Sequence, residues 1–284
     1  MYIYKSRYLT RAEVWYDGQP GDTRSVDWIF YQQRSSPLPG ASWKSFHTYV
    51  IDLTQSVEQL RKRMNEDTAY KVRRSRDRDK IICQECDARD PAILNQFEEM
   101  YNQFAALKGL SPLDRARMNA MAAAGTLDLS VARDPQGNAL VYHANYREHE
   151  RATELHLPSL YRKAADSATR NLIGRANRYL TWSDMLRFKE QGLKSFDFGG
   201  WYVGTTDSAL LRINDFKRGF GGQVVREYEC EQILSLKGWV VLRVAKLLKR
   251  IKLFPSASNP ASPPVEAQDP MAAPSAQRPT QTAP

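Results

Sequence analysis

The chain has 284 residues, of which 42% are hydrophobic, and carries a formal net charge of +9. That length suffices for one large domain or two small ones, and the charge favours anionic partners such as phosphate groups, nucleic acid or an acidic membrane surface. Three cysteines exclude a disulfide scaffold, and the chain shows neither a leader-like N-terminus nor a run of about 18 apolar residues, so we expect a cytoplasmic protein without a membrane span.

Residues 1–58 are expected to form a β-rich N-terminal region without long helices. Segments 12–16, 27–31 and 47–53 are rich in aromatic and β-branched residues, and clusters of Gly and Pro separate them. Thr54 follows the last of these segments. It is expected to cap a helix, because apolar residues recur at helical spacing after it.

Residues 61–80 are the most basic part of the chain, with nine Lys or Arg and four acidic residues. Two interpretations of this helical block stay open. One is a solvated helix face. The other is a helix that contacts phosphate groups through the planar guanidinium donors of Arg73, Arg74 and Arg76.

Strands and helices alternate through residues 80–232, and this alternation predicts a mixed α/β fold. Pro91 stands where a helix begins, while Gly109 and Gly192 stand where helices end. The expected strands are 80–86, 126–133, 139–146, 151–157, 195–198 and 223–230, and the expected helices are about 91–108, 112–124, 171–191 and 208–218.

The C-terminal part contains a helix and a low-complexity tail. Residues 235–254 are predicted to form a basic amphipathic helix, which either packs on the domain or lies on anionic lipid at the inner face of the membrane. Its terminal position and single sign of charge favour the lipid. Residues 255–284 hold eight of the fifteen prolines and no aromatic residue, so they are predicted to be disordered.

Two short motifs bear on metals and cofactors. Cys83 and Cys86 have the spacing of metal ligands, but no second pair accompanies them, so we expect no metal site. The segment NLIGRA at 171–176 resembles the pyrophosphate loop of GNAT-type acyltransferases, in which backbone N–H groups at a helix N-terminus hold a coenzyme A phosphate. Gly174 and Ala176 are the candidate cofactor contacts, and an ordinary helix start is the alternative.

His156 and Glu154 are candidates for a general base. Both lie on the strand expected at 151–157, and the period of two places them on one face. Either could accept a proton from an attacking amine, since the free pKa of histidine lies near neutral. The alternative for His156 is an ordinary packed side chain.

Asp197 and Lys217 are further catalytic candidates. Asp197 ends an apolar strand just before Gly199 and Gly200, so it either caps the turn or orients a substrate amine or a neighbouring base. Lys217 lies at the end of the helix expected at 208–218. There it either complements the helix dipole or stabilises an oxyanion or a substrate phosphate.

The segments DFGG at 197–200, FKRGFGG at 216–222 and GRANRYLTW at 174–182 resemble the Fem-type branch of the GNAT superfamily. That branch includes the peptidoglycan-bridge aminoacyltransferases and the BioF2-like acetyltransferase domains found with surface-polysaccharide genes. The resemblance covers about residues 60–232. It implies one complete GNAT-like acyltransferase domain over 59–234, with a truncated GNAT-like part before it.

The resemblance also implies acyl or aminoacyl transfer to an amine without metal, and it associates Lys217 with the reaction. Basic side chains in such enzymes bind the phosphates of a nucleotide- or lipid-linked sugar. The candidate substrate contacts in this sequence are Arg73, Arg74, Arg162, Arg175, Asn177, Trp182, Gly199, Gly200, Phe220 and Gly221.

We therefore expect an N-acyltransferase that modifies an amine of a cell-envelope or surface-polysaccharide precursor, with acyl-CoA favoured as co-substrate and no tightly bound cofactor. An aminoacyl-tRNA-dependent Fem-type peptidoglycan-bridge ligase is one alternative. Use of tRNA is not favoured, because the N-terminal region is too short for a complete first GNAT-like domain and no coiled-coil insertion is visible. The other alternative is a non-catalytic basic protein that docks on membrane or nucleic acid.

Overall fold

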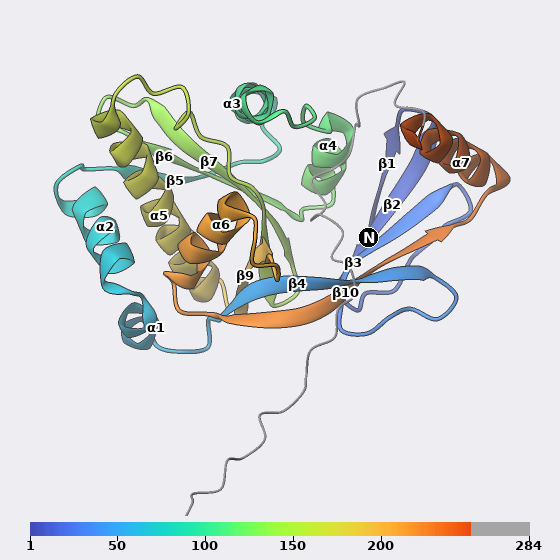
Figure 1. The fold of residues 1–284 in the computed structure, drawn as a ribbon, viewed down its shortest axis with the longest axis horizontal. Coiled ribbons are helices and arrows are strands. Elements are labelled where there is room, and N and C mark those ends of the chain that lie inside the picture. The colour runs from blue at the N-terminus through green and yellow to red at the C-terminus, as the bar shows by residue number, and fades with distance from the viewer. Residues whose placement is uncertain (251–284) are drawn as a thin grey trace, which may run out of the picture.

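One ten-stranded sheet runs through the fold in the order β1-β2-β3-β10-β4-β9-β8-β7-β6-β5 (Figure 1). The computed structural model describes the backbone of residues 1–250 and the side chains of residues 1–245. The strands are β1 (Tyr2–Ser6), β2 (Leu9–Trp15), β3 (Trp28–Arg34), β4 (Ser42–Asp52), β5 (Ile82–Cys86), β6 (Leu127–Arg133), β7 (Ala139–Glu148), β8 (Arg151–His156), β9 (Ser195–Gly200) and β10 (Gln223–Ile233). The helices are α1 (Val57–Arg63), α2 (Glu66–Asp77), α3 (Pro91–Lys108), α4 (Arg115–Ala123), α5 (Ser167–Glu190), α6 (Ser208–Arg218) and α7 (Leu236–Arg250).

Two long strands join the N-terminal region to the remainder of the sheet. β10 pairs antiparallel with β3 on one side and with β4 on the other, and β4 continues the sheet by pairing with β9. The sheet therefore has no break at the boundary expected at residue 58. β1, which the sequence patterns did not indicate, forms a hairpin with β2 at the edge of the sheet.

Helices cover both faces of the sheet because side chains of a strand alternate between them. On β6, Leu129 and Val131 pack in a core with α3 and α4, whereas Ala132 packs against α5. A further core on the α5 side contains Phe188 of α5 together with Leu60 of α1 and side chains from α2, β4 and β9. The result is a layered α/β arrangement in which α5 crosses one face (Figure 1).

The helix ends follow local capping chemistry. Asp90 caps α3, Pro91 occupies its first turn, and Gly109 ends it in the left-handed conformation with φ of 66°, as expected. The cap predicted at Thr54 is wrong. Ser56 caps α1 instead, because the hydroxyl of Thr54 donates to Asp52 at 2.6 Å.

The basic block at 61–80 is interrupted. Met64 is extended, with ψ of 141°, so α1 ends there. Asn65 then caps α2 by accepting a hydrogen bond from the backbone N–H of Thr68 at 2.8 Å. The predicted single helical block is thus two short helices joined by a turn.

α7 is the last element that the structure describes. The predicted continuation of this helix through 251–254 and the predicted disorder of 255–284 lie outside the described residues. Within residues 1–250, no helix is both long enough and apolar enough to cross a bilayer.

Candidate active site

The site lies where two parallel strands stop pairing. β8 and β9 are in register from Arg151 to Thr153 of β8. Just beyond, Gly199 takes φ of 67°, and a Cβ on it would lie 3.1 Å from the backbone oxygen of Glu154. A side chain at 199 would therefore be strained and crowded, so glycine lets β9 pass close to β8 at this point.

Lys217 enters the site from the last turn of α6. Its side chain is buried, and its Nζ donates to the backbone oxygens of Gly199, at 3.2 Å, and of Gly200. Burial lowers the pKa of Lys217, because the ammonium loses its hydration, while the charges of Glu154 and Asp197 act in the opposite direction. The lysine thus places a cation beside the glycine pair.

Glu154 brings a carboxylate to the same region. Its side chain is only 6% exposed, and among the described residues its Oε1 has no hydrogen-bond partner. Burial raises the pKa of Glu154 well above its usual range, and the nearby charges of His143 and Lys217 counter that rise. A buried carboxylate with an unused acceptor and a raised pKa is suited to accept a proton.

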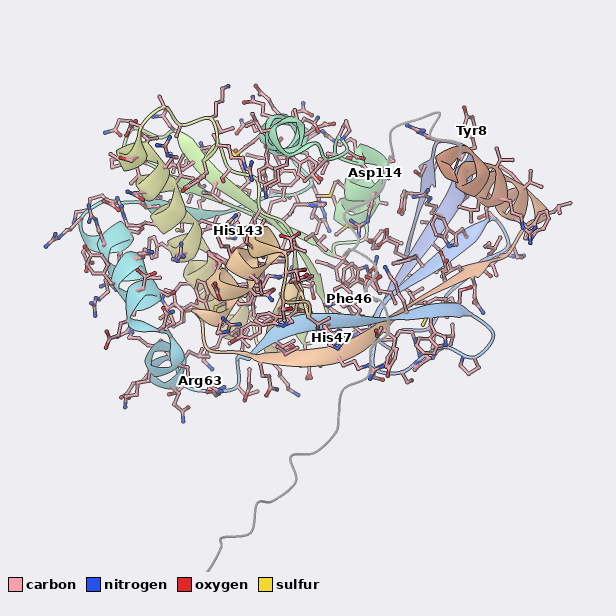
Figure 2. All side chains as sticks on the ribbon, viewed as in Figure 1. Tyr8, Phe46, His47, Arg63, Asp114 and His143 are labelled. Carbon is pink, nitrogen blue, oxygen red and sulfur yellow. The ribbon has the colours of Figure 1, made fainter. Side chains whose placement is uncertain are left out.

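His143 on β7 adds a second buried charge (Figure 2). Its Nδ1 lies 2.9 Å from a carboxylate oxygen of Asp184 on α5, and its Nε2 lies 2.7 Å from the amide oxygen of Asn177. Ser130 also donates to Asp184, at 2.9 Å. Burial alone would lower the pKa of His143, but the carboxylate of Asp184 accepts a hydrogen bond from the ring, and this bond and the negative charge raise the pKa above the ordinary value, which favours the imidazolium.

The sequence patterns did not single out His143 or Asp184 as functional residues. A signal was present, because Asp184 interrupts a run of apolar residues on a long amphipathic helix. A buried acid on such a face needs a partner. Arg187, three residues later on α5, pairs with one oxygen of Asp184 at 3.0 Å, and only the packing of α5 on the sheet shows that His143 pairs with the other.

Asp197 is saturated with donors. Its carboxylate accepts hydrogen bonds from Gln33 at 2.6 Å and from the backbone N–H of Gly199 at 2.7 Å, and also from Thr48 and Arg151. These donors come from β3, β4, β8 and β9. Asp197 therefore links four strands through its hydrogen bonds. Its carboxylate has little acceptor capacity left with which to orient a substrate amine.

His156 does not lie beside Glu154, so the expectation that they share a face is wrong. The β7–β8 register shifts by one residue, which pairs His156 with Ala144 and Glu154 with Asn145. The ring of His156 packs edge-on against Tyr101, with centroids 4.8 Å apart. Burial and the charge of Arg117 lower the pKa of His156 to about 3, which makes it a poor base.

The segment NLIGRA lies inside a helix instead of at its start. α5 begins at Ser167, and its cap is Asp166, whose side chain accepts from the N–H of Thr169. The backbone N–H groups of Gly174 and Ala176 are therefore in the helical interior and unavailable to a phosphate. The structure does not place these two residues at a pyrophosphate loop.

Several candidate substrate contacts have packing roles. Trp182 and Phe220 are buried in the core beside α5. Gly221 has φ of 80°, and a Cβ on it would lie 2.3 Å from the backbone oxygen of Arg63. Gly221 thus allows α1 to approach the end of α6.

The arginines predicted to bind substrate lie in two regions, one on α2 and α5 and the other in the loop before α5. Arg74 on α2 and Arg175 on α5 share one acidic partner, Asp79, whose carboxylate lies 2.6 Å from Arg175 and 3.8 Å from Arg74. Arg73 is exposed on α2. Arg162 is also exposed, in the loop before α5, and its charge acts on Lys108 at the end of α3.

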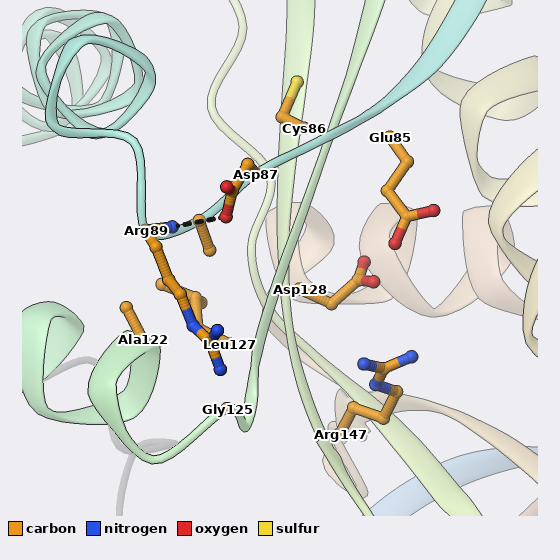
Figure 3. A pocket seen from close by; sticks show the side chains of 10 residues that line it. Glu85, Cys86, Asp87, Arg89, Ala122, Gly125, Leu127, Asp128 and Arg147 are labelled. Atoms are coloured by element: carbon orange, nitrogen blue, oxygen red, sulfur yellow. Dashed lines mark hydrogen bonds between the residues drawn. The ribbon is translucent and has the colours of Figure 1, made fainter.

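A separate cleft of about 420 Å³ lies at the start of β6, lined by charged residues that include Asp87, Arg89 and Arg147 (Figure 3). None of the predicted site residues lines it. Its carboxylates are largely engaged, since Asp87 accepts from the N–H of Arg89 at 2.9 Å and Asp128 accepts from Arg187. Glu154 and Lys217 therefore remain the candidate site.

Solved structures share this arrangement of elements. FemX matches with a TM-score of 0.54 and 14% identity, over 70% of this chain and 63% of the FemX chain. The C-terminal domain of a putative lysylphosphatidylglycerol synthetase from Agrobacterium fabrum matches with a TM-score of 0.50 and 15% identity, over 87% of this chain and 84% of that domain. The fold of this chain is therefore the one seen in FemX and in this synthetase domain.

The similarity to FemX confirms the predicted α/β fold class and the resemblance to Fem-type proteins. No family model matches the sequence, and no curated protein matches it either. The element order of this chain, with α5 between β8 and β9 and α6 between β9 and β10, is the order expected for residues 60–232.

Proposed function

We propose that this chain is an N-acyltransferase that acts on an amine of a cell-envelope or surface-polysaccharide precursor, with acyl-CoA as the donor. The observation that carries the proposal is the buried pair of Glu154 and Lys217 beside Gly199, where β8 and β9 stop pairing. The fold supports the same class of reaction, because it is shared with FemX and a putative synthetase of an aminoacylated lipid.

In the proposed reaction the acceptor amine attacks the acyl carbonyl carbon. A carbon–nitrogen bond forms, the bond from that carbon to the donor sulfur breaks, and the thiolate leaves with its electron pair. Glu154 accepts the proton that the nitrogen loses, which its raised pKa and unpaired oxygen favour. Lys217 stabilises the negative charge that develops on the carbonyl oxygen.

The basic side chains are proposed to hold the acceptor. Arg73, Arg74 and Arg175 lie on α2 and α5, which pack together, and their guanidinium groups suit the phosphates of a nucleotide- or lipid-linked sugar or peptide. The backbone N–H groups in the interior of α5 cannot hold the phosphates of coenzyme A, so another part of the chain would have to contact them.

The test is acyl transfer by Lys217→Ala. With a panel of acyl-CoAs and amino sugars, thiol release should depend on the acceptor, and kcat should fall roughly 100-fold in the variant, as for loss of one oxyanion donor. Lys189→Ala is the matched control, because Lys189 also ends a helix and donates to a backbone oxygen, that of Leu53 at 2.7 Å.

Three outcomes contradict the proposal in different ways. Turnover within a few-fold of the parent protein in Lys217→Ala removes the role of the lysine. A thermal shift with tRNA, with binding that weakens steeply as salt is raised, favours the aminoacyl-tRNA-dependent alternative. No transfer from any donor favours a non-catalytic docking protein.

A further inference from the structure

The outward face of α7 is apolar and basic at the same time. On its described part, the exposed apolar side chains are Leu236, Trp239, Val240 and Val244, with 78%, 45%, 45% and 49% of their surface exposed. These residues recur at helical spacing on one side of the helix. Gly238, on the opposite side, is buried.

The first turn of α7 is fixed to the body of the protein through Asp27. The backbone oxygen of Asp27 accepts from the N–H of Leu234 at 2.9 Å, and its carboxylate accepts from Ser235 at 2.6 Å and from Lys237 at 3.1 Å. A Cβ on Gly238 would lie 2.7 Å from the same backbone oxygen. These contacts fix which side of α7 packs against the protein, and the apolar side therefore faces outward.

All charges on α7 have one sign. Its sequence, LKGWVVLRVAKLLKR, contains five Lys or Arg and no acidic residue. The guanidinium of Arg243 lies 4.3 Å from the centroid of the Trp239 ring, so a cation and an aromatic ring are presented together. An acidic surface with an apolar layer beneath it complements this combination.

Neighbouring elements extend the same surface. Leu234, directly after β10, is 43% exposed. Tyr8, in the β1–β2 turn, is 73% exposed, and Figure 2 shows it at the same end of the molecule as α7. Thr10, two residues later, donates its N–H to Asp27, which places this turn near the start of α7.

We propose that this surface, formed by α7, Tyr8 and Leu234, docks on an anionic phospholipid bilayer. The apolar side chains enter the boundary between headgroups and acyl chains, and the basic side chains pair with lipid phosphates. The single sign of charge favours lipid over a mixed-charge protein partner. The inference goes beyond the proposed acyl transfer and does not depend on it.

The test is flotation of the full chain with vesicles. The protein should float with phosphatidylcholine vesicles that contain phosphatidylglycerol, and it should remain unbound with phosphatidylcholine alone. Two α7 variants, Arg243→Glu and the double variant Trp239→Ser/Val244→Ser, should each lower the partition coefficient about tenfold or more. Acyl transfer to a water-soluble acceptor should be unchanged in both variants.

Two matched controls carry the same chemical changes elsewhere. Arg61→Glu changes an exposed arginine on α1, and Ile82→Ser changes a 54% exposed isoleucine on β5, at the other edge of the sheet. Both should bind anionic vesicles as the parent protein does. Equal loss in Arg61→Glu and Arg243→Glu would overturn the proposal, because binding would then follow net charge alone. Failure of the parent protein to float with anionic vesicles would overturn it as well.

Discussion

Burial acts on Glu154 and Lys217 in opposite directions. It raises the pKa of the carboxyl group and lowers that of the ammonium group, because each charged form loses hydration. Each group then depends on the charge of the other. The raised pKa gives the carboxylate of Glu154 a greater affinity for a proton, which is what the proposed acyl transfer to nitrogen requires of a base.

At the scale of single residues, His143→Gln should change the pH dependence of the proposed reaction. The charge of His143 lowers the pKa of Glu154, so its loss should raise that pKa further. The base is active only when ionised. The acidic limb of the pH–rate profile of kcat/KM should therefore move to higher pH by about one unit.

His156→Gln is the control for that experiment. Since His156 packs against Tyr101 and does not face Glu154, its replacement should leave the profile where it is. A profile of His143→Gln that overlays that of the parent protein would show that His143 has no influence on the base. Thermal melting of both variants checks that they are folded.

At the scale of elements, the end of α6 depends on close backbone contact. Gly221 has φ of 80°, and a Cβ on it would lie 2.3 Å from the backbone oxygen of Arg63, so α1 leaves no room for a side chain there. Because Lys217 is in the last turn of α6, four residues before Gly221, this contact helps to hold the ammonium near Gly199.

Gly221→Ala should therefore lower the free energy of unfolding by more than about 2 kcal/mol, through both backbone strain and overpacking. Gly137→Ala is the control, because Gly137 has φ of 88° but nothing within 4 Å of a Cβ. It should show only the cost of strain, about 1 kcal/mol. Urea unfolding measures both values, and equal losses would show that contact with α1 adds nothing.

At the scale of the whole molecule, a buried ion pair ties the N-terminal strands to α4. Arg117 of α4 donates to both carboxylate oxygens of Glu13 of β2, at 2.7 and 2.8 Å. Tyr2 and Tyr4 donate to the same carboxylate at 2.6 and 2.8 Å. Both oxygens of the Glu13 carboxylate thus accept hydrogen bonds. The pair holds together Glu13 and Arg117, which are more than one hundred residues apart in the sequence.

Arg117→Met should lower the free energy of unfolding by about 3–5 kcal/mol, because it leaves the charge of Glu13 buried without its partner. Arg115→Met, on the same helix, removes a half-buried pair with Glu98 and should cost less than about 1 kcal/mol. Urea unfolding measures the free energy of unfolding of both variants. Similar decreases in the two variants would contradict a special role for the buried pair.

The same pair predicts how stability depends on pH. Burial alone would raise the pKa of Glu13, but the charge and hydrogen bonds of Arg117 lower it below the ordinary 4.5. A group whose folded-state pKa is lowered stabilises the fold above its unfolded pKa and loses that contribution as the pH falls. The parent protein should therefore lose stability below about pH 4.5.

The order of helices and strands between residues 60 and 232 was determined by the sequence itself. Hydrophobic period, capping residues and glycines act over a few neighbouring residues, so they can be read without the fold. Lys217 and Glu154 were also singled out as candidates in this way. The lysine stands beside a glycine-rich turn, and the glutamate stands on a strand of mixed polarity.

Only the tertiary structure decided which of the candidate residues meet. A one-residue shift between β7 and β8 separates His156 from Glu154, and no local pattern marks such a shift. Packing of α5 on the sheet pairs Asp184 with His143, and donors as distant as Gln33 saturate Asp197. Contacts between residues far apart in the chain depend on how whole elements pack, and for that reason the sequence patterns could propose the members of the site but not their partners.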